Sequence, residues 1–271
     1  MNEKKKKMLS IHASMRQSLG ARGRQEDAMA LSPAALVAQK GMMAVLSDGM
    51  GGMSNGDVFS DIAVKEMINA FQTQPFNEDL CATLQECYRF AQEKALAVQK
   101  MEEDEKGGAT VTAVLIRKGK CAFLSVGDSR ICLLRGGGLI QLNREHVFGT
   151  ALDERAALGV ISREEAQLHL ERKALTNYLG RQTTLACDVC AKPFTLLPGD
   201  KILLMSDGVF GTLDDQQIAQ LASLPHPQGA QAVIDAVIAQ NKPRQDNCSI
   251  LLISIDKGRP KGVGHQHGTK H

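Results

Sequence analysis

Hydrophobic residues in this chain follow two different spacings. Continuous apolar runs bounded by turn residues are typical of buried strands, whereas apolar positions three or four residues apart are typical of helices that pack on one face. The run Met42–Asp48 is a clear case of the first kind, since it stops at a carboxylate that glycines follow at once. Further strands are predicted at residues 11–17, 28–31, 109–116, 120–126, 130–134, 185–197, 201–205 and 248–255.

Four helices are expected between these strands. Helical spacing covers residues 54–71, and a second helix with Asn77 as its N-cap continues to residue 98. Two more are predicted later in the chain, one opening at Leu213 and one over residues 228–240. Because strands and helices do not alternate, the pattern predicts an α+β fold of mostly antiparallel sheets covered by helices.

Residues 143–184 differ in character from the rest of the chain. They are charged, helical in pattern and poor in β-branched runs, and Ser162-Arg163-Glu164-Glu165 has the spacing of a capping box. We interpret this segment as a flap inserted into the domain rather than as part of its core.

Composition indicates one globular domain without a membrane or nucleic-acid partner. The 271 residues suffice for one large domain or two small ones. We place a single domain at 9–256, between a flexible basic N-terminus (1–8) and a disordered tail (257–271). The net charge of +2 gives no reason to expect nucleic acid as a partner. No apolar run is long enough to span a bilayer, and no signal peptide is recognisable. A cytoplasmic protein is expected.

The seven cysteines are scattered and odd in number, which favours reduced thiols over a disulfide framework. Cys187 and Cys190 form a single CxxC motif. A zinc site would need a second pair of similar spacing. We therefore interpret these residues as two thiols on a strand.

Carboxylates recur at predicted strand ends and in glycine-containing turns. A buried carboxylate costs several kcal/mol unless a partner neutralises it, and no Lys or Arg lies within the stretch from Met42 to Gly52. Oxygen ligands without His or Cys companions favour Mg²⁺ or Mn²⁺ over zinc. The candidate metal ligands are Glu26, Asp27, Asp48, Asp128, Asp207 and Asp246.

Several carboxylates around one site indicate phosphoryl chemistry. Paired cations, roughly 3.5–4 Å apart, activate water and clamp the attacking and leaving oxygens. Phosphate monoester hydrolysis needs such electrostatic help because its uncatalysed rate is among the slowest known. Arg22, shortly before Glu26 and Asp27, is a candidate for binding phosphate through its guanidinium fork.

The segments that carry this chemistry resemble, in order, the motifs of the type 2C metal-dependent serine/threonine protein phosphatases, in particular the bacterial branch. The resemblance covers residues 10–256 and rests on Arg22–Asp27, Asp48–Gly52, Gly108–Thr110, Val126–Arg130, Ser206–Val209 and Asp246–Asn247. It implies a four-layer αββα sandwich with two, or with a weaker third site three, Mn²⁺ or Mg²⁺ ions at one end between the sheets.

The resemblance also implies a role for each site residue. Arg22 would grip the substrate phosphate, so the expected catalytic residues are Arg22, Asp48 and Asp207, and the flap would shape substrate choice. As metal ligands, Asp48 would bridge two ions and Gly49 would add its carbonyl oxygen. Asp207 and Asp246 would complete the coordination of one of these ions, and Glu26 and Asp27 would support the other largely through water. Asp128 with Asp207 would hold a third ion.

Three positions depart from the family pattern. Gln25 replaces the usual Asn, and Met50 and Met53 stand where relatives often carry His. A methionine cannot donate a proton, so a side-chain general acid at position 50 is excluded. These changes bear on rate and on acid catalysis, because they leave the metal ligands intact.

The predicted activity is metal-dependent hydrolysis of phosphoserine and phosphothreonine on proteins, by a monomer that opposes a partner kinase. The alternative is a catalytically weak phosphatase-like domain for signalling or binding, for which lost ligands would be expected. A nucleotide-binding loop at Asp48–Gly52 lacks the G-x-G-x-x-G order and the P-loop Lys. A calcium loop fails because its third position is Met50. A haloacid-dehalogenase-type site lacks its second Asp.

Overall fold

The computed structural model describes residues 9–50, 55–101, 107–182 and 187–258. The expectations for the basic N-terminus, for Met53 and for most of the C-terminal tail concern residues outside these ranges. The last described strand continues to Lys257, slightly past the predicted domain end. None of the helices in the described part combines the length and apolar character that a bilayer span requires.

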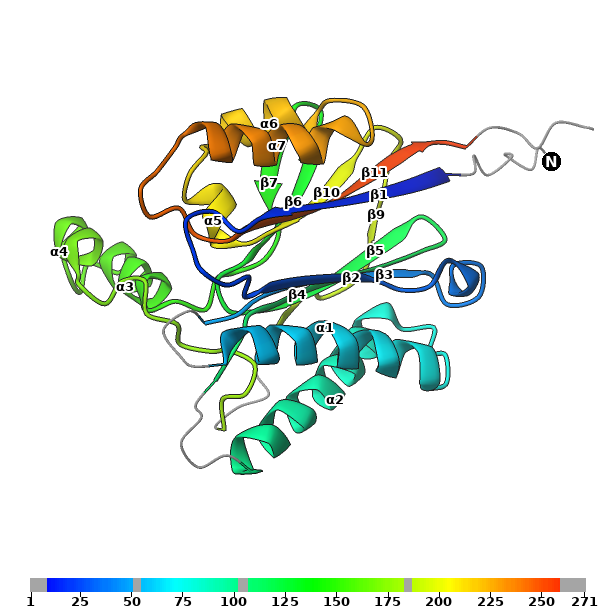
Figure 1. Ribbon diagram of the computed structural model, residues 1–271, viewed down its shortest axis with the longest axis horizontal. Coiled ribbons are helices and arrows are strands. Elements are labelled where there is room, and N and C mark those ends of the chain that lie inside the picture. Colours follow the sequence, from blue (N-terminus) through cyan, green and yellow to red (C-terminus); the bar gives the residue numbers. More distant parts are fainter. Residues whose placement is uncertain (1–8, 51–54, 102–106, 183–186, 259–271) are drawn as a thin grey trace, which may run out of the picture.

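Two antiparallel sheets lie face to face in the middle of the molecule (Figure 1). The first has the order β1 (Leu9–Ser18), β11 (Cys248–Lys257), β10 (Lys201–Met205), β6 (Arg130–Arg135) and β7 (Gly138–Gln141). The second has the order β2 (Asp27–Leu31), β3 (Met42–Asp48), β4 (Val111–Arg117), β5 (Lys120–Val126) and β8 (Asp188–Val189), and β9 (Phe194–Thr195) also pairs with β5.

Helices cover the outer face of each sheet, which gives the four-layer αββα sandwich (Figure 1). The second sheet is covered by α1 (Gly56–Thr73) and α2 (Leu80–Met101), and the first by α6 (Asp215–Ala222) and α7 (Gln228–Ala239). The flap, with α3 (Phe148–Ala157) and α4 (Arg163–Leu168), projects from one end of the sandwich. The short α5 (Asp207–Phe210) and the 3₁₀ turn η1 (Ala34–Leu36) complete the described helices.

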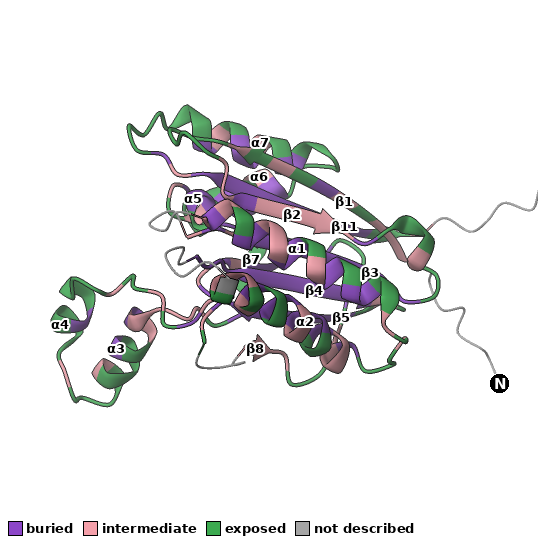
Figure 2. Cartoon of the chain, turned by 60° about the horizontal axis from the view of Figure 1, so that its bottom comes forward, coloured by how far each residue is buried: buried purple, intermediate pink, exposed green. Residues whose placement is uncertain are grey.

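The core has three layers, one between the sheets and one under each pair of helices. Strand β3 shows why its sequence is apolar throughout. Met43 and Val45 pack against α1 and α2, whereas Ala44 and Leu46 pack between the sheets. Successive side chains of a strand point to opposite faces, so a central strand of a sandwich is buried on both sides (Figure 2).

Two local predictions were wrong. The strand predicted at residues 185–197 is reduced to the two-residue strands β8 and β9, because Pro193 lies between them and has no N–H to donate to a ladder. Asn77 does not cap α2, since the Asp79 carboxylate instead accepts from the amides of Cys81 and Ala82. The capping box at Ser162 is confirmed, with both of its reciprocal hydrogen bonds to Glu165 present.

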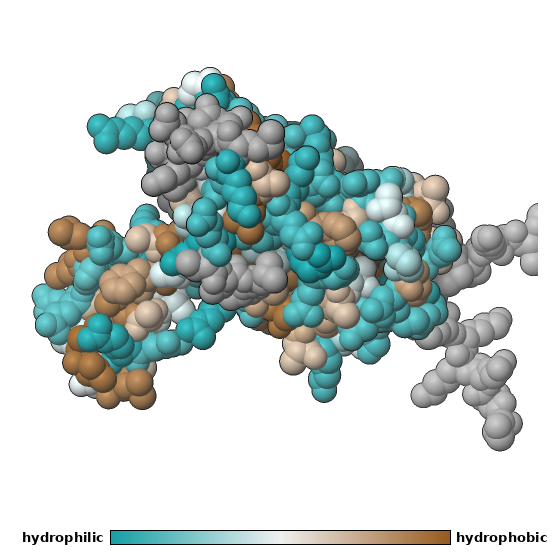
Figure 3. Space-filling view, turned by 90° about the horizontal axis from the view of Figure 1, so that it is seen from below, coloured by the Kyte–Doolittle hydropathy of each residue, from teal (hydrophilic) through white to brown (hydrophobic). Residues whose placement is uncertain are grey.

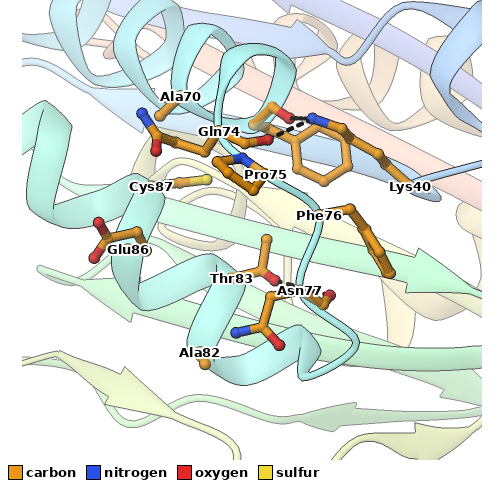
Figure 4. A pocket seen from close by; sticks show the side chains of 11 residues that line it. Lys40, Ala70, Gln74, Pro75, Phe76, Asn77, Ala82, Thr83, Glu86 and Cys87 are labelled. Atoms are coloured by element: carbon orange, nitrogen blue, oxygen red, sulfur yellow. Dashed lines mark hydrogen bonds between the residues drawn. The ribbon is translucent and has the colours of Figure 1, made fainter.

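The C-terminal end of α1 is capped by a buried lysine, Lys40, which lies in the turn between η1 and β3. Lys40 Nζ donates hydrogen bonds to the carbonyls of Phe71, Gln72 and Gln74 at 2.9, 2.8 and 2.7 Å. Figure 4 shows this ammonium group at the rim of a pocket between α1 and α2. A cation here satisfies carbonyls that have no partner within the helix and complements the negative end of the helix dipole.

Replacing Lys40 with Met is expected to lower the free energy of unfolding by about 2–4 kcal/mol, because three partly or fully buried carbonyls lose a charged donor. Urea unfolding measures the difference. Lys65→Met is the matched control on the exposed face of α1, where Lys65 forms a surface ion pair with Asp61, and it should change stability by less than about 0.5 kcal/mol. Equal losses in the two variants would contradict the capping role.

Candidate active site

The carboxylates singled out in the sequence come from both sheets and meet at one end of the sandwich. Asp48 ends β3, Asp207 follows β10, Asp128 lies in the turn between β5 and β6, and Asp246 precedes β11. They share a pocket whose described lining residues are Arg22, Glu26, Asp48, Gly49, Met50, Thr110, Asp128, Lys173, Leu175, Asp207, Asp246 and Asn247.

Asp27 lies beneath this pocket rather than on its lining. It is paired with Asp48 across β2 and β3 and is buried. Its Oδ2 accepts a hydrogen bond of 2.8 Å from Ser206 Oγ, but Oδ1 has no hydrogen-bond partner of acceptable geometry within the described residues. Burial raises the pKa of Asp27 to about 6, although the hydroxyls of Ser249 and Ser206 favour the ionised form.

Burial and mutual repulsion raise the pKa of the other central carboxyls. The pKa of Asp48 lies well above its ordinary value because the group is desolvated and because Asp27, Asp207, Asp128 and Asp246 surround it with negative charge. Burial and Asp207 raise the pKa of Asp128 to about 6. The pKa of Asp207 is raised by burial and by Asp246, with Lys173 and Arg22 opposing the shift.

These observations fit a site for hard divalent cations. The potential metal ligands that line the pocket are carboxylate and carbonyl oxygens, which suit Mg²⁺ or Mn²⁺. An unpartnered buried carboxylate oxygen at Asp27 and the raised pKa values are both what a nearby cation would relieve.

Arg22 and Asp246 form an ion pair at this pocket. Within the described ranges, no group of three or more Asp, Glu, His or Cys side chains has the spacing of a metal site. Asp246 Oδ2 instead accepts from Arg22 at 2.6 Å, and both side chains are well exposed. A cation at Asp246 would therefore compete with Arg22 for this carboxylate.

Backbone contacts fix the turns that present the carboxylates. The Gly49 amide donates to the Glu26 carbonyl at 3.0 Å, so the ends of β2 and β3 stay together. A side chain at Gly49 would place its Cβ 2.3 Å from the Gly56 carbonyl oxygen, so the approach requires glycine. Thr110 joins two turns, because its hydroxyl accepts from the Asp48 amide and shares a hydrogen bond with Ser129 Oγ, next to Asp128.

The flap contributes residues that the sequence did not single out. Lys173 and Leu175 line the pocket, and Lys173 is a second cation beside Asp207. His146 holds the turn before Asp128, since its Nδ1 accepts from the Gly127 amide at 3.1 Å and its own amide donates to the Gly127 carbonyl at 2.8 Å. Nothing in a charged segment distinguishes one lysine from its neighbours, so these contributions were not predictable.

The raised pKa of Asp128 has a testable effect on stability in the presence of a chelator. The folded pKa of Asp128 is about 6, above its ordinary value of 3.8, so the protonated carboxyl favours the folded state. This contribution to stability is fully present below pH 4 and is lost as the pH rises through 6. Asp128→Asn should therefore raise the free energy of unfolding at pH 7.5 by on the order of 2 kcal/mol, and by much less at pH 4. Chemical denaturation at both pH values measures this. A variant less stable than the parent at pH 7.5 would contradict the assignment.

Comparisons with known proteins agree with this geometry. The family model described as protein phosphatase 2C matches residues 21–250. The serine/threonine protein phosphatase PstP of Mycobacterium tuberculosis is 30% identical over 217 residues, which is 78% of this chain and 40% of that protein. The chain thus spans well under half of this relative. The serine/threonine phosphatase stp of Listeria monocytogenes is 28% identical over 79% of this chain and 86% of its own length.

Solved structures show the same architecture. The crystal structure of M. tuberculosis PstP superposes with a TM-score of 0.74 at 26% identity, covering 91% of this chain and 99% of that one. A second structure of the PstP catalytic domain, described as a complex with two manganese ions, has a TM-score of 0.73 at 25% identity over 92% of this chain and all of that one. The chain belongs to the protein phosphatase 2C family.

Proposed function

We propose that this chain hydrolyses phosphoserine and phosphothreonine on proteins with the help of Mn²⁺ or Mg²⁺. The observation that carries the proposal is the meeting of carboxylates from both sheets around one pocket that also holds two cationic side chains, Arg22 and Lys173. Manganese is the first ion to test, because the superposed PstP catalytic domain contains two manganese ions.

The expected ligands are the residues that line or support the pocket. Asp48 is central, since the charges of the other four aspartates act on it. The adjacent Gly49 also lines the pocket, and its carbonyl oxygen is proposed as a further ligand. When bound, the ions would supply a nucleophile from water and neutralise the phosphoryl oxygens. The proposed set is Glu26, Asp27, Asp48, Gly49, Asp128, Asp207 and Asp246.

Two cationic side chains that line the pocket are candidates for binding the substrate phosphate. Arg22 lies at the mouth of the pocket, and its guanidinium can present two parallel donors to phosphate oxygens once Asp246 turns away. Lys173 reaches the pocket from the flap and adds a point charge. We propose that Arg22 positions the phosphate, with Lys173 as a weaker contributor.

Departure of the substrate hydroxyl cannot rely on a proton from position 50. Met50 lines the pocket, and its thioether carries no exchangeable proton. Catalysis is therefore assigned mainly to positioning and charge stabilisation.

The flap is proposed to influence which phosphoproteins are accepted. Figure 3 shows hydrophobic side chains gathered on this projecting segment, and Leu158, Val160, Leu168 and Leu170 are exposed there. We propose that this surface contacts apolar residues of a protein substrate. We also propose that the protein is monomeric and cytoplasmic, and that a partner kinase phosphorylates its substrates.

Arginine substitutions test phosphate binding. Arg22→Ala should lower kcat/KM toward a phosphothreonine peptide by about 10- to 100-fold, mainly through KM, because a bidentate phosphate contact is removed. Steady-state phosphate release measures it. Arg24→Ala is the matched control, since Arg24 pairs with Asp57 and does not line the pocket. Similar losses of kcat/KM in the two variants would show that general positive charge near the pocket, rather than a bidentate contact from Arg22, promotes phosphate binding.

A further inference from the structure

The CxxC motif acquires a different partner in the folded chain. Cys190 Sγ lies 3.5 Å from Cys81 Sγ, although the two residues are 109 positions apart in sequence. The Cys81 thiol also donates toward the Cys190 carbonyl, with a separation of 3.3 Å. The two sulfur atoms are therefore already in contact across the boundary between α2 and the segment that follows β8.

Both thiols are held in place by their surroundings. Cys81 lies in the first turn of α2, where its amide donates to the Asp79 carboxylate. Cys190 is fixed to β5, because its amide donates to the Phe123 carbonyl at 3.3 Å and its Sγ accepts from the Phe123 amide at 3.4 Å. The contact thus joins two ordered elements rather than two loose side chains.

Exposure separates this pair from most of the other cysteines. Cys81, Cys187 and Cys190 are partly exposed, whereas Cys87, Cys121, Cys132 and Cys248 are buried. A small oxidant can therefore reach the pair. None of the three partly exposed cysteines lines the carboxylate pocket, so the pair is independent of the proposed hydrolytic chemistry.

We propose that Cys81 and Cys190 form a disulfide when the protein meets a peroxide. In the first step a Cys190 thiolate attacks one peroxide oxygen, the O–O bond breaks, and hydroxide leaves to give the sulfenic acid. In the second step Cys81 sulfur attacks the sulfenic sulfur and displaces its hydroxyl as water. Two thiols and one hydrogen peroxide become one disulfide and two waters, with sulfur oxidised and peroxide oxygen reduced.

The order of attack follows from the environment of the thiols. A helix N-terminus ordinarily lowers the pKa of a thiol, but burial and the contact with Cys190 raise the pKa of Cys81 to about 12. Cys81 is therefore poorly suited to the first attack, and it serves as the resolving thiol.

The bond would fasten α2 to the edge of the second sheet. Closing a loop of 109 residues restricts the unfolded chain, and stabilisation grows with loop length. The oxidised protein should unfold at a temperature higher by roughly 5–10 °C than the reduced protein.

The test uses the full chain, treated with hydrogen peroxide or with dithiothreitol, and digested after blocking of free thiols. The expected result is a cross-linked peptide containing Cys81 and Cys190, and a rise in unfolding temperature that dithiothreitol reverses. Cys81→Ser should abolish both effects, and Cys187→Ser, which changes the other thiol of the motif, should keep both.

Three results would overturn the proposal. One is a Cys187–Cys190 cross-link in place of the Cys81–Cys190 peptide. Another is oxidation of Cys190 to sulfinic acid without any cross-link. The third is stoichiometric zinc in the purified protein that Cys81→Ser removes, since this would make the cysteines metal ligands. Peptide mapping reports the linkage itself, so it remains decisive even if a variant is less stable.

Discussion

Replacing Asp48 with Asn is expected to lower kcat/KM toward a phosphothreonine peptide by about a thousandfold or more, because the central anionic ligand of the proposed metal site is lost while the side chain keeps its size. Asp48 is the carboxylate on which four other aspartates act. Its removal should also weaken binding of Mn²⁺, which calorimetric titration measures separately from turnover.

Asp57→Asn is the matched control for Asp48→Asn. Asp57 lies in the first turn of α1, pairs with Arg24 and does not line the pocket, so activity should stay within about threefold of the parent. Full activity and Mn²⁺ binding in Asp48→Asn would remove Asp48 from the centre of the site.

Gly208→Ala is expected to lower the free energy of unfolding by about 3 kcal/mol or more and to abolish hydrolysis. A Cβ at position 208 would lie 1.9 Å from the Asn247 carbonyl oxygen. Backbone atoms must then move, either in the turn that carries Asp207 or in the loop that carries Asp246. Because both residues are proposed ligands, one shift disturbs stability and metal binding together.

The effect of Gly208→Ala is measured by urea unfolding and by Mn²⁺ titration of the folded variant. Gly138→Ala provides the comparison, since the nearest atom to its added Cβ would be the Arg135 carbonyl oxygen at 3.7 Å, an ordinary contact. That variant should behave like the parent. A Gly208→Ala protein as stable as the parent would contradict the close approach of Gly208 to the Asn247 carbonyl.

Much of the site was predictable because burying a carboxylate is unfavourable. Asp48 and Asp207 end apolar strands, and that cost indicated a shared cation before any contact was known. The structure places both on one pocket. Asp27 was a candidate in the sequence only because it adjoins Glu26. Its position below the pocket depends on the pairing of β2 with β3.

The order and spacing of the apolar runs predicted mostly antiparallel sheets covered by helices, and the four-layer sandwich was implied by the family resemblance. Details set by tertiary contacts were not predictable. The cap of α2 moved from Asn77 to Asp79, two residues that are both suitable caps. Lys173 lines the pocket only because of the path that the flap takes in the folded chain. Likewise, the contact of Cys190 with Cys81 joins segments that no local pattern connects.

The most direct test of the account is phosphate release from a phosphothreonine peptide by the full chain, measured while Mn²⁺ is titrated from a chelated baseline at neutral pH. The carboxylate site predicts no release above the blank with chelator and a saturable rise as Mn²⁺ is added. Release at the same rate in excess chelator, or none at any Mn²⁺ concentration, would contradict a metal-dependent phosphatase.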